Sequence, residues 1–126
     1  MKDIINTNNA PAPIGPYNQA IKAGNTLYVS GQIALSPQTG ELILGSIAEQ
    51  TKTVLENLHA ILKEAGYSFA DVVKTSIFLT DMDNFGVVNE VYGEYFTENA
   101  PARETVAVKG LPKGMDVEIS CIAWKA

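Results

Sequence analysis

The chain has few of the side chains from which disulfides and metal sites are built. Its 126 residues include one cysteine, Cys121, and one histidine, His59. A single cysteine cannot form a disulfide within the chain, and a structural zinc site needs several Cys and His ligands. We therefore expect neither feature, although one histidine is still enough for a catalytic pair.

Clustered positive charge and long apolar runs are also missing. The formal net charge is −5, and the eight lysines are scattered along the chain. An acidic chain of this kind is a poor candidate for binding nucleic acid or anionic membranes. No apolar stretch approaches the ~20 residues that span a bilayer, and the N-terminal "MKDIINTNNAPAP" becomes polar too early for a signal peptide. We expect a cytoplasmic protein without a membrane or nucleic-acid partner.

Apolar residues, in contrast, make up 46% of the sequence. Over this length, that share fits one domain that spans residues 1–126 and has its own core. No internal repeat or low-complexity tract divides the chain.

Two segments have the residue spacing of amphipathic helices. The first runs from about 46 to 65, where "SIAE" is a capping box and apolar residues recur at intervals of three and four. Gly66 then occupies the position of a C-terminal cap. The second runs from about 83 to 97 and has aromatic and aliphatic residues on one side, but Gly86 and Gly93 weaken the prediction.

Other segments are rich in β-branched and aromatic residues and predict strands, at 25–34, 72–80, 104–108 and 117–124. Weaker strands are expected near Ile4 and at 18–21. The order of strands, helix, strand, helix and strands predicts an α+β fold, in which two helices cover one face of a single mixed sheet.

Alternation along these strands divides their residues between two faces of the sheet. The first face is apolar and is expected under the helices; it comprises Leu27, Val29, Ile33, Val73, Ile77, Leu79, Val106, Val108, Val117, Ile119 and Cys121. The second face is mixed and comprises Tyr28, Ser30, Gln32, Lys74, Ser76, Phe78, Arg103, Thr105, Glu118, Ser120, Ile122 and Trp124. Its apolar members form a patch of the kind that another subunit usually covers. Because Arg103 and Glu118 fall on this same face, we expect a pocket at a subunit boundary.

Arg103 is the only arginine, and it stands at the start of an apolar, β-branched run in "PARETV". Its planar guanidinium can grip a carboxylate or phosphate with two parallel hydrogen bonds, which the ammonium of lysine cannot do. The anion is either a ligand or a partner side chain such as Glu118 or Glu104. The residues alone do not decide between a binding site and an interface salt bridge.

Six segments, in the order in which they occur, resemble the Rid family of reactive intermediate (imine) deaminases: "APAPIGPYNQAI", "VSGQI", "VVKTSIFLTDMDNF", "VNEVYGEYF", "PARETVAV" and "LPKGMDVEISCIAWKA". The resemblance covers about residues 10–125. It implies a chorismate-mutase-like fold and a barrel-like homotrimer, with sheets facing the three-fold axis, helices outside and pockets between subunits. The arginine of "PAR" marks the RidA-like catalytic subgroup. That subgroup hydrolyses 2-iminobutanoate and 2-iminopropanoate to 2-oxo acids and ammonia, and no metal or organic cofactor is implied.

The resemblance also implies roles for individual residues. Arg103 would clamp the carboxylate of the substrate, and Glu118 would orient or activate a water molecule. The residues that match the family's substrate pocket are Tyr17, Ser30, Gly31, Asn89 and Thr105. Thr105 stands where many members have cysteine, so no catalytic thiol is required, and Cys121 is expected to pack in the core.

Two other functions are compatible with the sequence. One is an endoribonuclease or translation inhibitor, and the other is a non-catalytic module that binds a small carboxylate or acts as a chaperone-like holdase. RNA cleavage needs positive charge to bind phosphates, and the acidic balance with one arginine argues against it. Arg103 would serve a binding module equally well, so a turnover assay is needed to separate that module from an enzyme.

Overall fold

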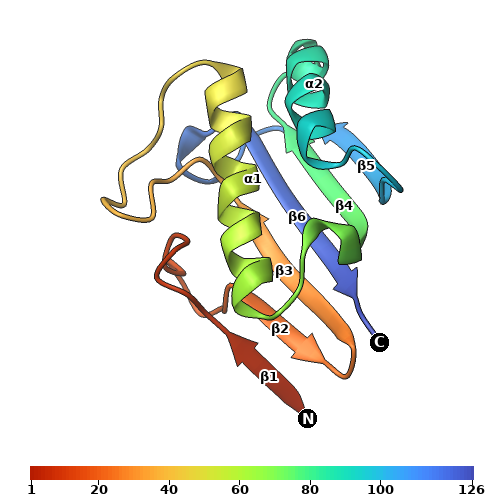
Figure 1. Cartoon of the computed structure of the whole chain (residues 1–126). Helices are drawn as coiled ribbons and strands as arrows, with labels where there is room; N and C mark the ends of the chain where they lie inside the picture. Colours follow the sequence, from red (N-terminus) through yellow and green to blue (C-terminus); the bar gives the residue numbers. More distant parts are fainter.

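The sheet has six strands in the order β1-β2-β3-β6-β4-β5, and both α-helices cover one of its faces (Figure 1). The computed structural model describes all residues, 1–126. The elements are β1 (Lys2–Ile5), β2 (Ala20–Ala23), β3 (Thr26–Gln32), α1 (Ile47–Glu64), β4 (Val72–Leu79), α2 (Phe85–Tyr95), β5 (Ala102–Ala107) and β6 (Val117–Trp124). Only β4 and β5 pair in parallel; the other neighbours are antiparallel. The predicted α+β fold with one mixed sheet is confirmed.

The ends of α1 are set by the residues that predicted them. At the start, Ser46 Oγ accepts a hydrogen bond from the backbone N–H of Glu49 at 3.2 Å. At the end, Gly66 has a φ of 81°, and its N–H donates to the carbonyl of Lys63. This left-handed conformation closes the last turn at little cost only for glycine. The predicted helix is therefore confirmed to within one residue at each end.

The second helix, α2, begins later than predicted because a 3-10 turn over residues 82–84 precedes it, and it ends two residues earlier, at Tyr95. Asp81 caps that turn, and the α-helix itself begins at Phe85. Its buried side chains are Val88, Val91 and Tyr92. Neither α-helix combines the length and the apolar character needed to cross a membrane.

The core lies between the sheet and the two helices. The central strand β6 alternates regularly, and its Val117 and Ile119 are fully buried together with Leu55 and Leu58 of α1. Cys121 lies on the same side of β6 and is 5% exposed, and burial raises the pKa of its thiol to about 12. It therefore packs as a small core residue, as expected.

Two register shifts move residues away from the face on which simple alternation places them. In β4 the pairing with β6 shifts between Val72 and Lys74, so Val73 is 48% exposed and Val72 enters the core in its place. In β3 the pairing with β6 shifts between Val29 and Gln32, so Gln32 is buried instead of lying on the open face. An irregular residue in one strand of a pair reverses the alternation beyond it.

The faces of β5 are the reverse of those predicted. The parallel register pairs Arg103 with Thr75 and Thr105 with Ile77. Paired residues point to the same side of a sheet, and both partners in β4 are buried under the helices. Arg103 and Thr105 therefore lie on the helix side, whereas Val106 is 43% exposed on the open side. The prediction was wrong because a short edge strand does not have to bury its β-branched residues.

The open face of the sheet has no cover within the chain. Tyr28 and Trp124 are 51% and 50% exposed, and Phe78 and Ile122 are partly buried between them and their neighbours. The predicted apolar patch is therefore present, and Val106 joins it. Its burial against another subunit stays a prediction.

Candidate functional site

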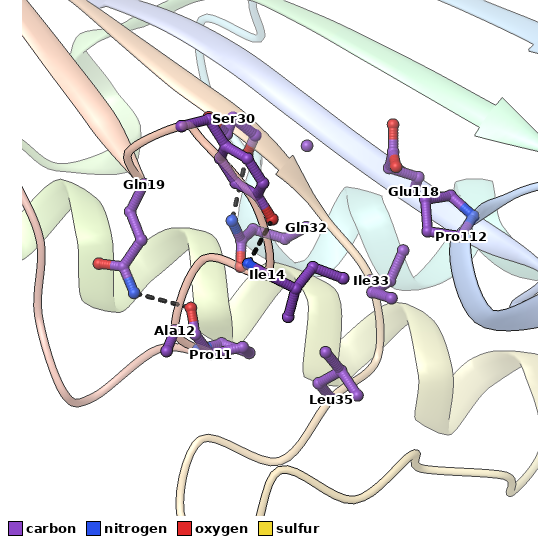
Figure 2. A pocket seen from close by; sticks show the side chains of 12 residues that line it. Pro11, Ala12, Ile14, Gln19, Ser30, Gln32, Ile33, Leu35, Pro112 and Glu118 are labelled. Atoms are coloured by element: carbon purple, nitrogen blue, oxygen red, sulfur yellow. Dashed lines mark hydrogen bonds between the residues drawn. The ribbon is translucent and has the colours of Figure 1, made fainter.

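A cavity of 420 Å³ lies where the loop before β2, the end of β3 and the start of β6 meet (Figure 2). Its walls include four residues that the sequence assigned to the site, namely Tyr17, Ser30, Gly31 and Glu118. Apolar side chains, among them Ile14 and Ile33, form much of the remaining surface. We call the four assigned residues the carboxylate pocket.

Glu118 enters the cavity from β6, where it pairs with Phe78 of β4. Its carboxyl group lies so close to Gly31 that a Cβ on that glycine would stand 2.6 Å from Oε2. No basic side chain pairs with it, and burial raises the pKa of Glu118. A raised pKa makes the ionised carboxylate a stronger proton acceptor than an ordinary glutamate.

The hydroxyl groups of the carboxylate pocket differ in what they can still bind. Ser30 Oγ donates to the carbonyl of Asn18 at 2.7 Å, so its proton is engaged and its lone pairs are available as acceptors. Tyr17 Oη accepts a long hydrogen bond from the N–H of Ile14 at 3.4 Å and keeps its own proton free. The pocket therefore offers an acceptor, a donor and a carboxyl group to one small volume.

Arg103 lies on the other side of the sheet, in a corner between β5 and α2. Its Nη1 donates to Asn89 Oδ1 at 2.8 Å, and its guanidinium carbon lies 4.9 Å from the ring centre of Tyr92 and 5.7 Å from that of Phe85. Residues 85, 89 and 92 share one face of α2 because they are four and three positions apart. We call Arg103 and these three residues the arginine corner.

The positive charge of Arg103 is not neutralised within the chain. The only salt bridge joins Lys74 to Glu104 at 3.4 Å, on the open face. Glu104 therefore does not pair with its neighbour Arg103, and Glu118 is on the opposite side of the sheet. The guanidinium is held in place by an amide and two rings, and it remains available to an anion.

The carboxylate pocket and the arginine corner do not form a single site within one chain. The sequence placed Arg103 and Glu118 on the same face, and this was wrong because β5 has the reverse orientation. Asn89 lies in the arginine corner rather than in the carboxylate pocket. Thr105 lies on the helix side of β5, two residues beyond Arg103, and its buried Oγ1 has no hydrogen-bond partner.

Residues that commonly bind metals are dispersed. His59 is exposed on α1, with its ring 5.3 Å from that of Phe69, and Cys121 is in the core. No three His, Cys, Asp or Glu side chains come together in an arrangement that can hold a metal ion.

A family profile described as endoribonuclease L-PSP matches residues 7–125, nearly the whole chain. The chain belongs to the Rid family, which includes the L-PSP proteins. A Rid-family relative, a RutC family protein of Pyrococcus horikoshii, is 56% identical over 99% of both chains. A second, from Mus musculus, is named 2-iminobutanoate/2-iminopropanoate deaminase; it is 48% identical over 98% of this chain and 91% of its own.

Solved Rid-family structures confirm the expected chorismate-mutase-like fold. The crystal structure of Escherichia coli TdcF with bound serine superimposes with a TM-score of 0.94. It is 41% identical in sequence and covers 98% of this chain and 99% of its own.

Phe85 and Tyr92 are parts of the site region that the sequence reasoning missed. Both were interpreted only as apolar positions of a helix. The signal that identifies them is their spacing from Asn89, which places all three on one helical face. That signal becomes useful only once the structure places Arg103 on the helix side of β5.

Proposed function

We propose that the protein hydrolyses 2-imino acids, such as 2-iminobutanoate and 2-iminopropanoate, to 2-oxo acids and ammonia. Membership of the Rid family and a mouse relative named for this activity support the proposal. The serine bound to TdcF supports a small ligand of this kind, because serine, like a 2-imino acid, has its carboxylate attached to the carbon that carries nitrogen. In our proposal the carboxylate pocket of one subunit meets the arginine corner of the next.

The observation that carries the proposal is that Arg103 is oriented but not neutralised. A 2-imino acid has a carboxylate attached directly to the reacting carbon. Two hydrogen bonds from a guanidinium would fix that carboxylate and so orient the C=N bond. Each charged hydrogen bond contributes about 1.5–3 kcal/mol, which is substantial for a ligand with few heavy atoms.

The two clusters need a second copy of the chain to meet. The exposed apolar patch on the open face, with Tyr28, Val106 and Trp124, supports burial against such a copy. Following the family, we expect a homotrimer with three sites. In each of them Glu118 would face Arg103 of the partner subunit.

The chemistry requires one proton acceptor and one proton donor near the imine. Water adds to the carbon of the C=N bond while Glu118 accepts one of its protons, and the imine nitrogen takes a proton from Tyr17 or solvent. The tetrahedral intermediate then carries one hydroxyl and one amino group. Glu118 returns its proton to the leaving nitrogen, ammonia departs, and the hydroxyl proton restores the donor as the oxo group forms. No redox step is involved.

The test generates 2-iminobutanoate in situ with threonine dehydratase and follows its loss with and without this protein. We expect the wild type to accelerate the loss, and Glu118→Gln to slow the catalysed rate by about 10²–10⁴-fold. Glu64→Gln, at an exposed position near the end of α1, is the matched control and should behave as the wild type. A wild-type protein that leaves the imine decay unchanged would refute the proposal.

The family description leaves endoribonuclease activity as a second candidate. The net charge of −5 and the single arginine give little positive charge for an RNA backbone. The same preparations, incubated with labelled RNA over a range of salt concentrations, test this function. RNA cleavage that Glu118→Gln abolishes, without imine turnover, would favour the ribonuclease. Binding of a small carboxylate without either activity would favour a binding module.

A further inference from the structure

The carboxylate pocket is bordered by a long loop that has almost no backbone hydrogen bonds of its own. The loop comprises residues 6–19 and joins β1 to β2, whose Ile5 and Ala20 are paired. Its one internal backbone hydrogen bond runs from the N–H of Tyr17 to the carbonyl of Gly15. Three prolines, at 11, 13 and 16, remove N–H donors from it. A loop of this length without internal structure is unusual unless other groups hold it.

The side chain that holds this loop is Gln19. It is 1% exposed, and its Nε2 donates to the carbonyls of Thr7, Ala10 and Pro11 at 3.0, 3.2 and 2.8 Å. Its Oε1 accepts from the N–H of Thr7 at 2.6 Å. Figure 2 shows the amide pointing at the loop backbone beside Pro11. One amide thus makes four hydrogen bonds to the loop backbone, and Asn6 adds bonds to Asn18 and to the N–H of Gln19 at the two ends of the loop.

The chemistry of this position favours glutamine over similar side chains. The loop presents three inward carbonyls and one inward N–H, so it needs two donor hydrogens and an acceptor at the same place. Glutamate has no donor when ionised, lysine and arginine have no acceptor, and asparagine is one methylene shorter. An unpaired carbonyl at this depth would carry a desolvation cost.

The loop that Gln19 holds forms a wall of the cavity. Pro11, Ala12, Ile14 and Tyr17 all line it. The backbone of Gln19 also joins the loop to β3 beside the cavity, since its carbonyl oxygen accepts a hydrogen bond from the N–H of Ser30 at 2.9 Å.

We propose that Gln19 is a positioning residue, whose amide fixes the loop of residues 6–19 and thereby sets the width of the cavity and the place of Tyr17. It does not take part in the chemistry itself. The effect on catalysis depends on the proposed function of this cavity, whereas the effect on the loop does not.

Gln19→Met tests the proposal, because methionine keeps the length and volume of the side chain and removes every hydrogen bond. Hydrogen–deuterium exchange of residues 6–18, measured by mass spectrometry, should become at least about tenfold faster, since several hydrogen bonds are lost. The KM for 2-iminobutanoate should rise about tenfold while kcat changes less than about threefold, because Glu118 and Arg103 are untouched and solvent can supply the proton that Tyr17 would otherwise give. If Gln19→Met does not fold, Gln19→Asn replaces it, since it keeps an amide but is one methylene too short to reach all of the same backbone groups.

Gln50→Met is the matched control. Gln50 is also buried, at 5% exposed, and bonds to Asp116, but it does not line the cavity. The variant Gln50→Met should lower the melting temperature, while hydrogen–deuterium exchange of residues 6–18 and the KM stay as in the wild type. Unchanged loop exchange in Gln19→Met would overturn the proposal, and so would faster exchange with an unchanged KM. If the wild type shows no imine turnover, the proposed function fails, and the exchange data alone decide whether Gln19 holds the loop.

Discussion

Replacing Arg103 by lysine should separate the geometry of the arginine corner from its charge. Lysine keeps the positive charge and most of the side-chain length. It loses the planar fork that donates to Asn89 with one nitrogen and leaves others for an anion. If charge alone attracted the substrate, the two side chains would be nearly equivalent.

The expected loss can be estimated from the contacts. Lysine gives up one of two parallel hydrogen bonds to the substrate carboxylate, about 1.5–3 kcal/mol for a charged bond. It also gives up part of the stacking on Tyr92 and Phe85, about 0.5–1 kcal/mol at an exposed site. Because Arg103 is exposed in the single chain, the lower part of this range applies. At about 1.4 kcal/mol per decade, kcat/KM should fall about 10–100-fold.

The assay measures imine hydrolysis and oligomer mass on the same samples. A double-mutant cycle with Asn89→Ala adds a check on the geometry. Asn89→Ala should reduce kcat/KM in the wild type and have little further effect in Arg103→Lys, because the lysine ammonium cannot bond to both Asn89 and the substrate.

Two results would refute this reasoning. Wild-type kcat/KM in Arg103→Lys would show that the fork is not used, and additive losses in the cycle would show that Asn89 does not act through Arg103. A variant that no longer assembles, with lost activity, would instead assign Arg103 to an interface.

Three further predictions concern the carboxylate pocket and the assembly. Burial raises the pKa of Glu118, and Arg103 of the partner subunit would lower it in the assembled site, so kcat/KM should increase with pH as this carboxyl ionises and the midpoint should be higher in Arg103→Ala than in the wild type; an unchanged midpoint in Arg103→Ala would contradict the assignment. In Gly31→Ala the added Cβ would stand 2.6 Å from Glu118 Oε2 and would displace the flexible carboxyl group. This variant should lower kcat at least about tenfold and change the melting temperature little. A large drop in melting temperature would contradict this. Sedimentation should give a trimer for the wild type and smaller species for Trp124→Lys, and a wild-type monomer at micromolar concentration would refute the assembly.

The raised pKa of Glu118 also has a consequence for stability. A group whose pKa is higher in the folded state favours folding when protonated, so its contribution is present at low pH and is lost as pH rises through the folded pKa. Glutamine has no carboxyl group to ionise, so Glu118→Gln removes this loss of stability with rising pH. In the unassembled chain, where no basic side chain pairs with Glu118, the variant should therefore be more stable than the wild type at neutral pH, and the difference should shrink in acid.

The features that the sequence predicted well are those fixed by local chemistry. The capping residue Ser46 and the glycine at position 66 determine where α1 begins and ends, whatever the rest of the chain does. The regular alternation of β6 likewise placed Glu118 on the open face together with Ser30. Four residues of the cavity were therefore predicted together from strand periodicity and family resemblance.

The orientation of β5 was not predictable in the same way. Its six residues carry β-branched side chains on both faces, and an edge strand has a neighbour on one side only. The register with β4 decides which face is covered, and that register depends on tertiary packing rather than on the strand itself. A single reversed strand was enough to place Arg103 on the wrong side of the sheet.

The corrected position explains why the one arginine of the chain stands at this point. On the open face, Arg103 would have taken the place of Glu104 beside Lys74, so that two positive charges would lie together. On the helix side it meets one face of α2, which supplies an amide oxygen from Asn89 and the rings of Phe85 and Tyr92. Tyr92 is itself fixed, because its hydroxyl group shares a 2.7 Å hydrogen bond with Thr75. Only a planar cation can bond at its edge, stack on its face and still present donors to an anion.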